Sequence, residues 1–155
     1  MVAPPAGVES APGPAGWQDD PSHLAEHTEA AGPGEPAGRW ASPGETFEVT
    51  LRLSDAAAVL VLVGEVDIGT VPTLREALEA VPEEQRLVVL DLRRLSFADS
   101  SMLSALMATG ARLRSRGADL RLVGAQGAVR QVLDITGVAQ EIALFDTLDD
   151  ALADR

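Results

Sequence analysis

Residues 87–113, LVVLDLRRLSFADSSMLSALMATGARL, show the pattern of a buried strand followed by a short loop and a helix. The apolar run of residues 87–92 is interrupted only by Asp91, as expected for an inner strand that is covered on both faces of a sheet. After the loop, apolar residues recur at helical spacing, at Leu103, Leu106, Met107, Gly110 and Leu113. This spacing predicts an amphipathic helix that packs against the sheet.

Three polar residues, Asp99, Ser100 and Ser101, stand where this helix must begin. Each has a side-chain oxygen that can accept a hydrogen bond from the backbone N–H groups left unpaired at a helix N-terminus. The residues by themselves therefore predict a helix cap. They leave open which of the three is the N-cap residue and whether the junction has any further function.

Two strands and a helix are predicted before this stretch. Residues 47–53 alternate between apolar and polar, which indicates a strand with one face toward a core. Residues 57–63 form a second apolar run, so the two segments together predict a hairpin. A helix is expected over about residues 70–81, with Pro72 in its first turn, where proline is tolerated.

Shorter elements alternate after the central helix: a strand at 120–123, a helix at 129–135 that ends at Gly137, a strand at 141–145 and a helix at 146–153. This alternation implies an α/β fold: a single domain with a mixed, mostly parallel β-sheet, an antiparallel N-terminal edge hairpin and about four helices. We assign residues 45–155 to this domain. The carboxyl ends of its inner strands, where such sheets present functional groups, hold Glu65, Asp67 and Asp99.

Residues 1–44 differ in composition, because they contain eight of the ten prolines and almost no Val, Ile or Leu. Such a segment cannot bury enough apolar surface to offset the entropy lost on ordering, so we predict a disordered tail. Trp40 is expected to rest on the folded domain, whereas Trp17 is either a docking residue for a partner or part of the disordered chain. His23 and His27 are four residues apart, but two imidazoles in a Pro-rich segment are a weak metal signal.

Composition and charge exclude several classes of protein. The 155-residue chain has a net charge of −12 and no Lys, so a nucleic-acid surface, which needs clustered basic residues, is not expected. The longest apolar run, residues 56–63, is far shorter than the roughly 20 residues that cross a bilayer. The N-terminus also lacks the pattern of a signal peptide. We therefore expect a cytoplasmic protein without direct membrane insertion.

Catalysis is not expected, because residues 45–155 contain no His, Cys, Lys or Tyr. The usual general bases and activated nucleophiles are thus missing, and carboxylates and hydroxyls remain. An acidic metal site formed by Glu65, Asp67 and Asp99 is disfavoured, since neither a general base nor a phosphate-binding Gly-Lys loop accompanies it. We predict no enzyme activity, no cofactor and no metal site.

Three segments resemble the motifs of one family. Residues 64–67, Gly-Glu-Val-Asp, match its G-E-hydrophobic-D signature. Residues 91–101 match its D-L-x-x-L-x-F-x-D-S-S core, and residues 128–137 match its A-V-x-x-x-L-x-x-x-G segment. Over residues 45–155 the chain thus resembles the STAS domain family, in particular the anti-sigma factor antagonists.

This resemblance implies a partner switch. Antagonists of the family bind an anti-sigma factor that is also a serine kinase, and so free a sigma factor for transcription. The kinase phosphorylates the serine that follows the aspartate of D-S-S, and a serine phosphatase resets it. In this chain that serine is Ser100, with Ser101 as the second choice. The surface that meets the partner is expected to include Asp67, Asp99, Ser100, Ser101 and Met102.

The chain departs from the family pattern directly after D-S-S, where the family usually has Gly and this chain has Met102. We expect Met102 to place an exposed, flexible apolar side chain beside the serine. It would then slow phosphorylation, or alter the partner, or be a surface residue of no consequence. An alternative function keeps the fold without the switch, as a scaffold subunit of a stress-signalling or membrane-transport complex.

Overall fold

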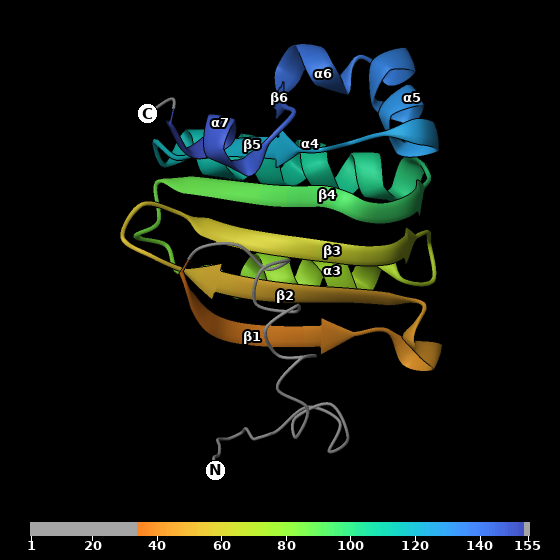
Figure 1. The fold of residues 1–155 in the computed structure, drawn as a ribbon, viewed down its shortest axis with the longest axis horizontal. Helices are drawn as coiled ribbons and strands as arrows, with labels where there is room; N and C mark the ends of the chain where they lie inside the picture. The colour runs from red at the N-terminus through yellow and green to blue at the C-terminus, as the bar shows by residue number, and fades with distance from the viewer. Residues whose placement is uncertain (1–33, 154–155) are drawn as a thin grey trace. The chain divides into compact units, whose positions relative to one another are not determined.

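The computed structural model describes residues 34–153, so the expectations for Trp17, His23 and His27 lie outside it. Its centre is a six-stranded sheet in the order β1-β2-β3-β4-β5-β6 (Figure 1). The strands are β1 (Glu35–Ala41), β2 (Phe47–Leu53), β3 (Ala58–Val66), β4 (Leu87–Ala98), β5 (Asp119–Val123) and β6 (Ala143–Phe145). Strands β1 to β3 pair antiparallel and strands β3 to β6 pair parallel. The predicted α/β fold with a mixed sheet is confirmed.

Five α-helices lie within the described range: α3 (Val71–Glu79), α4 (Ser100–Ser115), α5 (Gly127–Thr136), α6 (Val138–Glu141) and α7 (Leu148–Ala153). A 3-10 helix, η1 (Pro43–Glu45), joins β1 to β2. About four helices were expected, and the additional one is α6. It is separated from α5 by Gly137, whose left-handed backbone (φ 82°) ends α5 at the predicted position.

Strand β1 corrects the predicted domain boundary, because it lies inside the range 1–44 assigned to a disordered tail. Its sequence, EPAGRWA, has neither alternation nor β-branched residues, so no local pattern marks a strand. It is ordered by backbone pairing with β2, and it occupies the sheet edge, where Pro36 is tolerated. Trp40 packs against the core as expected. The domain therefore includes residues 35–41, which lie before the predicted boundary at residue 45.

Helices α3 and α4 cover one face of the sheet (Figure 1), and the main core lies between them and the strands. The apolar runs read from the sequence supply this core: Phe47, Val49 and Leu51 of β2, Leu60 and Leu62 of β3, Leu90 and Leu92 of β4, and Leu106 of α4 are each at most 2% exposed. Burying a side chain of this size contributes about 1.5–3 kcal/mol. The core thus holds β4 and α4, and with them the junction between the two, in one orientation.

Strand β4 contains Asp91, the one charged residue of its apolar run, which is only 1% exposed. Its carboxylate accepts hydrogen bonds from the Arg93 backbone N–H (3.1 Å) and from Nε (2.9 Å) and Nη2 (2.5 Å) of the same residue. These bonds raise the pKa of Arg93. The aliphatic part of the Arg93 side chain packs directly over Gly124. A side chain at position 124 would clash with it, because an added Cβ would lie 2.1 Å from Arg93 Cγ. This pair sits where β4 shifts register against β3, between Asp91 and Arg94.

Candidate functional site

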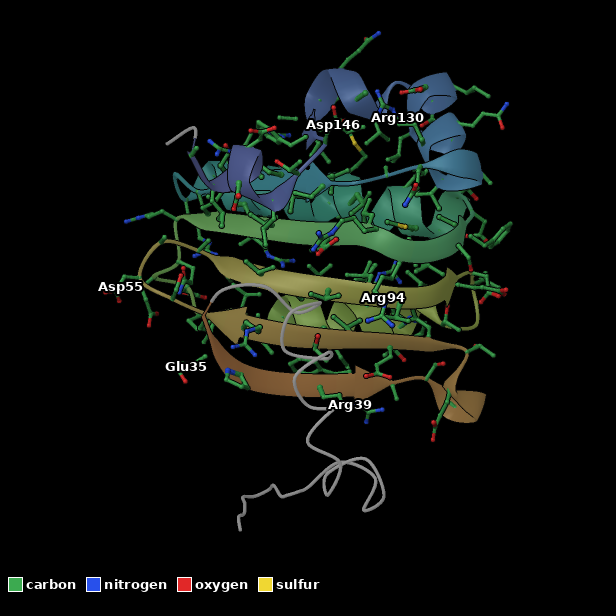
Figure 2. The ribbon with its side chains drawn as sticks, viewed as in Figure 1. Glu35, Arg39, Asp55, Arg94, Arg130 and Asp146 are labelled. Carbon is green, nitrogen blue, oxygen red and sulfur yellow. The ribbon has the colours of Figure 1, made fainter. Side chains whose placement is uncertain are left out.

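The carboxyl ends of β3 and β4 lie side by side, with Val66 paired to Ala98. The Asp99 backbone N–H donates to the Val66 carbonyl oxygen (3.2 Å), so the loop after β3 and the start of α4 form one surface. The turn between β2 and β3, where Figure 2 labels Asp55, lies at the opposite end of the sheet. Asp67, Asp99, Ser100 and Ser101 are therefore brought to one place, as predicted.

Asp99 is the N-cap residue of α4. Its backbone is extended (φ −117°, ψ −169°), and its Oδ1 accepts hydrogen bonds from the Ser101 backbone N–H (2.8 Å) and the Ser101 hydroxyl (2.5 Å). The hydrogen bond from the Ser101 hydroxyl is the largest cause and lowers the pKa of Asp99; burial, the second largest, raises it, and the backbone N–H groups of Ser101, Met102 and Ile68 each lower it by less. Asp99 is therefore a carboxylate at neutral pH, with several donors directed at it.

The two serines of the junction differ in their surroundings. Ser101 is half-buried, and its hydroxyl is held by Asp99. Ser100, the first residue of α4, is exposed, and its hydroxyl has no hydrogen bond to any group within residues 34–153. Only the hydroxyl of Ser100 is thus presented to solvent without an internal partner. The sequence could not predict this difference, because the two serines are identical and adjacent.

Asp67 closes the turn between β3 and α3. Its Oδ1 accepts hydrogen bonds from the backbone N–H groups of Gly69 (2.9 Å) and Thr70 (3.0 Å). The Thr70 hydroxyl accepts from the Asp67 backbone N–H (2.9 Å) and donates to the Glu65 carbonyl oxygen (2.9 Å). The carboxylate of Asp67 therefore acts within its own turn, and that turn presents Ile68 to solvent with 82% of the residue exposed.

The prediction that Met102 is exposed beside the serine was wrong, because its side chain is fully buried. With α4 beginning at Ser100, the buried stripe of the helix runs through Met102, Ala105, Leu106, Thr109, Gly110 and Leu113. Leu103 and Met107, which the sequence analysis placed on the packed stripe, are only half-buried. Met102 therefore fills the core and does not line the surface around Ser100.

Two exposed apolar residues near the junction were missed from the sequence, Ile68 (82% exposed) and Phe97 (43%). Phe97 is in β4, two residues before Asp99, and pairs in register with Glu65. A signal for Ile68 was available, since an isoleucine between Asp67 and Gly69 belongs to a turn rather than to a strand or helix stripe. The sequence alone could not show that the Ile68 side chain is exposed, because that depends on which other residues pack against the turn.

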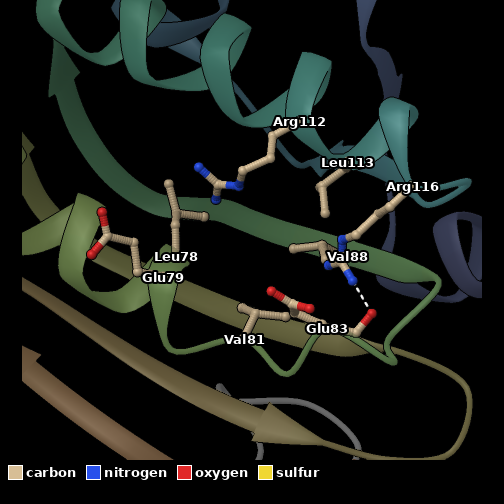
Figure 3. A pocket seen from close by; sticks show the side chains of 8 residues that line it. All are labelled: Leu78, Glu79, Val81, Glu83, Val88, Arg112, Leu113 and Arg116. Atoms are coloured by element: carbon tan, nitrogen blue, oxygen red, sulfur yellow. Dashed lines mark hydrogen bonds between the residues drawn. The ribbon is translucent and has the colours of Figure 1, made fainter.

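Two of the hollows along helix α4 lie toward its two ends. One, of about 480 Å³, is lined by Leu103, Ser104 and Met107 and by Thr136, Gly137, Val138, Gln140 and Glu141. The other, of about 280 Å³, lies at the far end of α4, where Arg112, Leu113 and Arg116 face Leu78 and Val81 (Figure 3). There the Arg116 guanidinium donates to the Glu83 carbonyl oxygen. This second pocket is remote from Ser100.

Neither a metal centre nor a membrane span is evident in the part of the chain that the structure describes. Between residues 34 and 153, no three His, Cys, Asp or Glu side chains gather closely enough to hold a metal ion. No helix in this range is long and apolar enough to cross a membrane.

Comparison with known proteins places this junction in a family. The model of the STAS domain family matches residues 48–151. The anti-sigma-F factor antagonist RsfB of Mycobacterium tuberculosis is 30% identical over 112 residues, which cover 72% of this chain and 91% of that protein. The anti-sigma-B factor antagonist of Listeria monocytogenes is 30% identical over 100 residues, covering 64% and 87% of the two chains.

The fold agrees with the sequence match. The crystal structure of an anti-sigma factor antagonist from Mycobacterium paratuberculosis superposes with a TM-score of 0.65 at 30% identity, over 72% of this chain and 96% of that chain. The family model covers β3, β4 and the helix that carries Ser100. The chain therefore belongs to the STAS domain family, and the relatives that it resembles at this level are anti-sigma factor antagonists.

Proposed function

We propose that this chain is a cytoplasmic anti-sigma factor antagonist that binds an anti-sigma factor with serine kinase activity through the surface around Ser100. Phosphorylation of Ser100 by that kinase switches binding off, and a serine phosphatase restores it. The antagonist role is supported by the named relatives. The observation that carries the switch is the exposed Ser100 hydroxyl, unpaired within the described residues, beside a Ser101 hydroxyl that Asp99 already holds.

A phosphate on Ser100 changes the charge of this surface more than its fold. Phosphoserine carries about −1.5 to −2 charges at neutral pH, and a helix N-terminus accommodates an anion through its N–H groups. The Ser101 N–H is already taken by the Asp99 carboxylate, so the phosphate adds a second anion beside the first. Any partner that covers Ser100 must then desolvate both anions, which costs binding free energy. A loss of about 3 kcal/mol weakens a complex by roughly two orders of magnitude.

The test is affinity capture from the native cells with Ser100→Ala and Ser100→Asp chains as parallel baits. We expect the Ala bait to retain an ATP-binding kinase that the Asp bait loses. The purified kinase with ATP should then phosphorylate the native chain at Ser100, as mapped by mass spectrometry, and should still phosphorylate a Ser101→Ala chain. Identical proteins on both baits would instead favour the non-switching scaffold.

A further inference from the structure

Three large apolar residues of the described chain are exposed: Ile68 (82%), Phe97 (43%) and Ile135 (75%). Single exposed hydrophobic residues are common on protein surfaces, so exposure alone indicates nothing. Ile68 and Phe97 nevertheless flank the Asp99–Ser100 junction, whereas Ile135 is on helix α5. Ile68 and Ile135 thus offer the same side chain at nearly the same exposure on two different elements, the turn after β3 and helix α5.

Ile68 is distinguished by the way its backbone is held. In the turn that carries Ile68, the Asp67 carboxylate accepts hydrogen bonds from the N–H groups of Gly69 and Thr70. The Thr70 hydroxyl accepts one from the Asp67 N–H and donates one to the Glu65 carbonyl oxygen. The start of α4 also lies against this loop, since the Asp99 backbone N–H donates to the carbonyl oxygen of Val66, two residues before Ile68. An exposed isoleucine on a turn tied at this many points loses little backbone freedom when a partner covers it. Binding of such a preordered group costs less entropy than binding of a mobile one.

We infer that Ile68 is the apolar anchor of the Ser100 surface, seated in an apolar pocket of the anti-sigma factor, and that Asp67 is a positioning residue that holds it there. This inference rests on the proposed function. Interface energy concentrates in a few side chains that fill pockets of the partner. Because the Asp99 backbone is bonded to Val66, two residues before Ile68, and the Asp99 carboxylate holds Ser101, a phosphate on Ser100 lies near the anchor and must be desolvated whenever Ile68 is seated.

The charge of this surface favours a pocket on an anti-sigma factor over an anionic lipid surface or a second copy of this chain. Glu65 and Asp67 stand within three residues of the anchor in the sequence, and the Asp99 backbone is bonded to Val66 of the same loop, in a chain with a net charge of −12. An anionic lipid surface would be repelled by these carboxylates, and a second copy of the chain would present the same carboxylates across a symmetric contact. The surface instead fits a pocket that is apolar at its centre and basic at its rim, on a different protein.

The experiment measures binding of single-residue variants to the purified kinase that the Ser100→Ala bait retains and the Ser100→Asp bait loses. Measured by titration calorimetry, Ile68→Ala should bind at least tenfold more weakly than the native chain, and Ile68→Val should keep most of the native affinity. Ile135→Ala is the matched control and should bind within twofold of the native chain. Thermal melting should be unchanged for all three variants, since neither isoleucine is buried.

The role of Asp67 has its own readout. Asp67→Ala should speed amide exchange at residues 68–70 and weaken binding, while Asp67→Asn, which keeps the acceptor oxygen, should restore both. If Asp67 acts through Ile68, the Asp67→Ala/Ile68→Ala double variant should bind no more weakly than Ile68→Ala alone. Ile68→Ala binding within twofold of native would overturn the inference and leave the proposed function standing. Baits that retain no distinguishing kinase would overturn both.

Discussion

Strand β4 has one aspartate in its interior and a second directly after its end, and their surroundings are opposite. Asp91 is 1% exposed and receives all its side-chain hydrogen bonds from Arg93, its near neighbour in the strand. Asp99 is partly exposed and collects donors from α4 and from the turn after β3. The Asp91 carboxylate is too deeply buried for another protein to reach, whereas the Asp99 carboxylate lies at an accessible surface.

The comparison shows that two aspartates in a D-x₇-D spacing can differ completely: the first is buried in an ion pair inside the sheet, and the second caps a helix at the surface where we propose that a partner binds. An ionised group inside a sheet must be paired, since an unpaired buried charge is strongly destabilising. A carboxylate at a helix N-terminus is stabilised by N–H groups while remaining in contact with water. Variants at the two positions should therefore affect different measurements.

The largest expected effect on stability comes from Arg93→Ala, which leaves the Asp91 carboxylate buried without its cation. We expect a loss of about 3 kcal/mol in the free energy of unfolding, at the lower end for breaking a buried pair because Arg93 itself is 43% exposed. Urea denaturation measures it. Arg94→Ala, the exposed neighbour, should stay within about 0.5 kcal/mol of the native chain. An equal loss in the two variants would show that the Asp91 pair does not stabilise the sheet.

The largest expected effect on recognition comes from Ser100→Asp, with binding of the kinase weakened about 100-fold at unchanged thermal stability. Surface plasmon resonance with immobilised kinase measures the first and thermal melting the second. Ala56→Asp adds the same charge in the β2–β3 turn at the opposite end of the sheet (Figure 2) and should bind normally. Equal weakening by both variants would mean that overall charge, and not the junction, controls binding.

A smaller effect on stability is expected from Asp99→Ala, which removes the N-cap of α4 and should cost about 1 kcal/mol at pH 7. The pKa of Asp99 is lowered from its ordinary value of 3.8 in the folded chain, so its contribution is complete above that value. As the pH falls through the lowered pKa, the contribution is lost and the two chains should converge. Urea denaturation at pH 7, 5 and 3 checks this, and a difference that persists undiminished at the lowest pH would contradict the sign.

The smallest effect is expected from Ser101→Ala, which should cost about 0.5 kcal/mol and leave phosphorylation of Ser100 intact. Because the Ser101 hydroxyl is the largest cause of the lowered pKa of Asp99, that pKa should rise toward its ordinary value. Titration of the Asp99 carboxyl carbon by NMR measures the change. An unaltered titration curve would mean that the backbone N–H groups alone hold the carboxylate.

Much of the fold follows from patterns that neighbouring residues share. The alternation of residues 47–53, the apolar run of β4 and the stop at Gly137 each carry a local physical cause, so the hairpin, the inner strand and the end of α5 were predicted in place. The junction at 99–101 was also marked, because Asp and Ser favour helix N-termini. These features depend on periodicity and capping, which act within a few residues.

Other features were decided only when distant segments met. Strand β1 has no strand pattern of its own and exists through pairing with β2. The burial of Met102 depends on the residue at which α4 begins, since one position of rotation about the helix axis moves a side chain from surface to core. The unequal serines and the exposed Ile68 likewise depend on how the end of β3 lies against the end of β4. The sequence by itself determined most of the elements and the position of the junction at 99–101, and the tertiary structure decided which side chains that junction presents, because exposure is set by neighbours that are far apart in the chain.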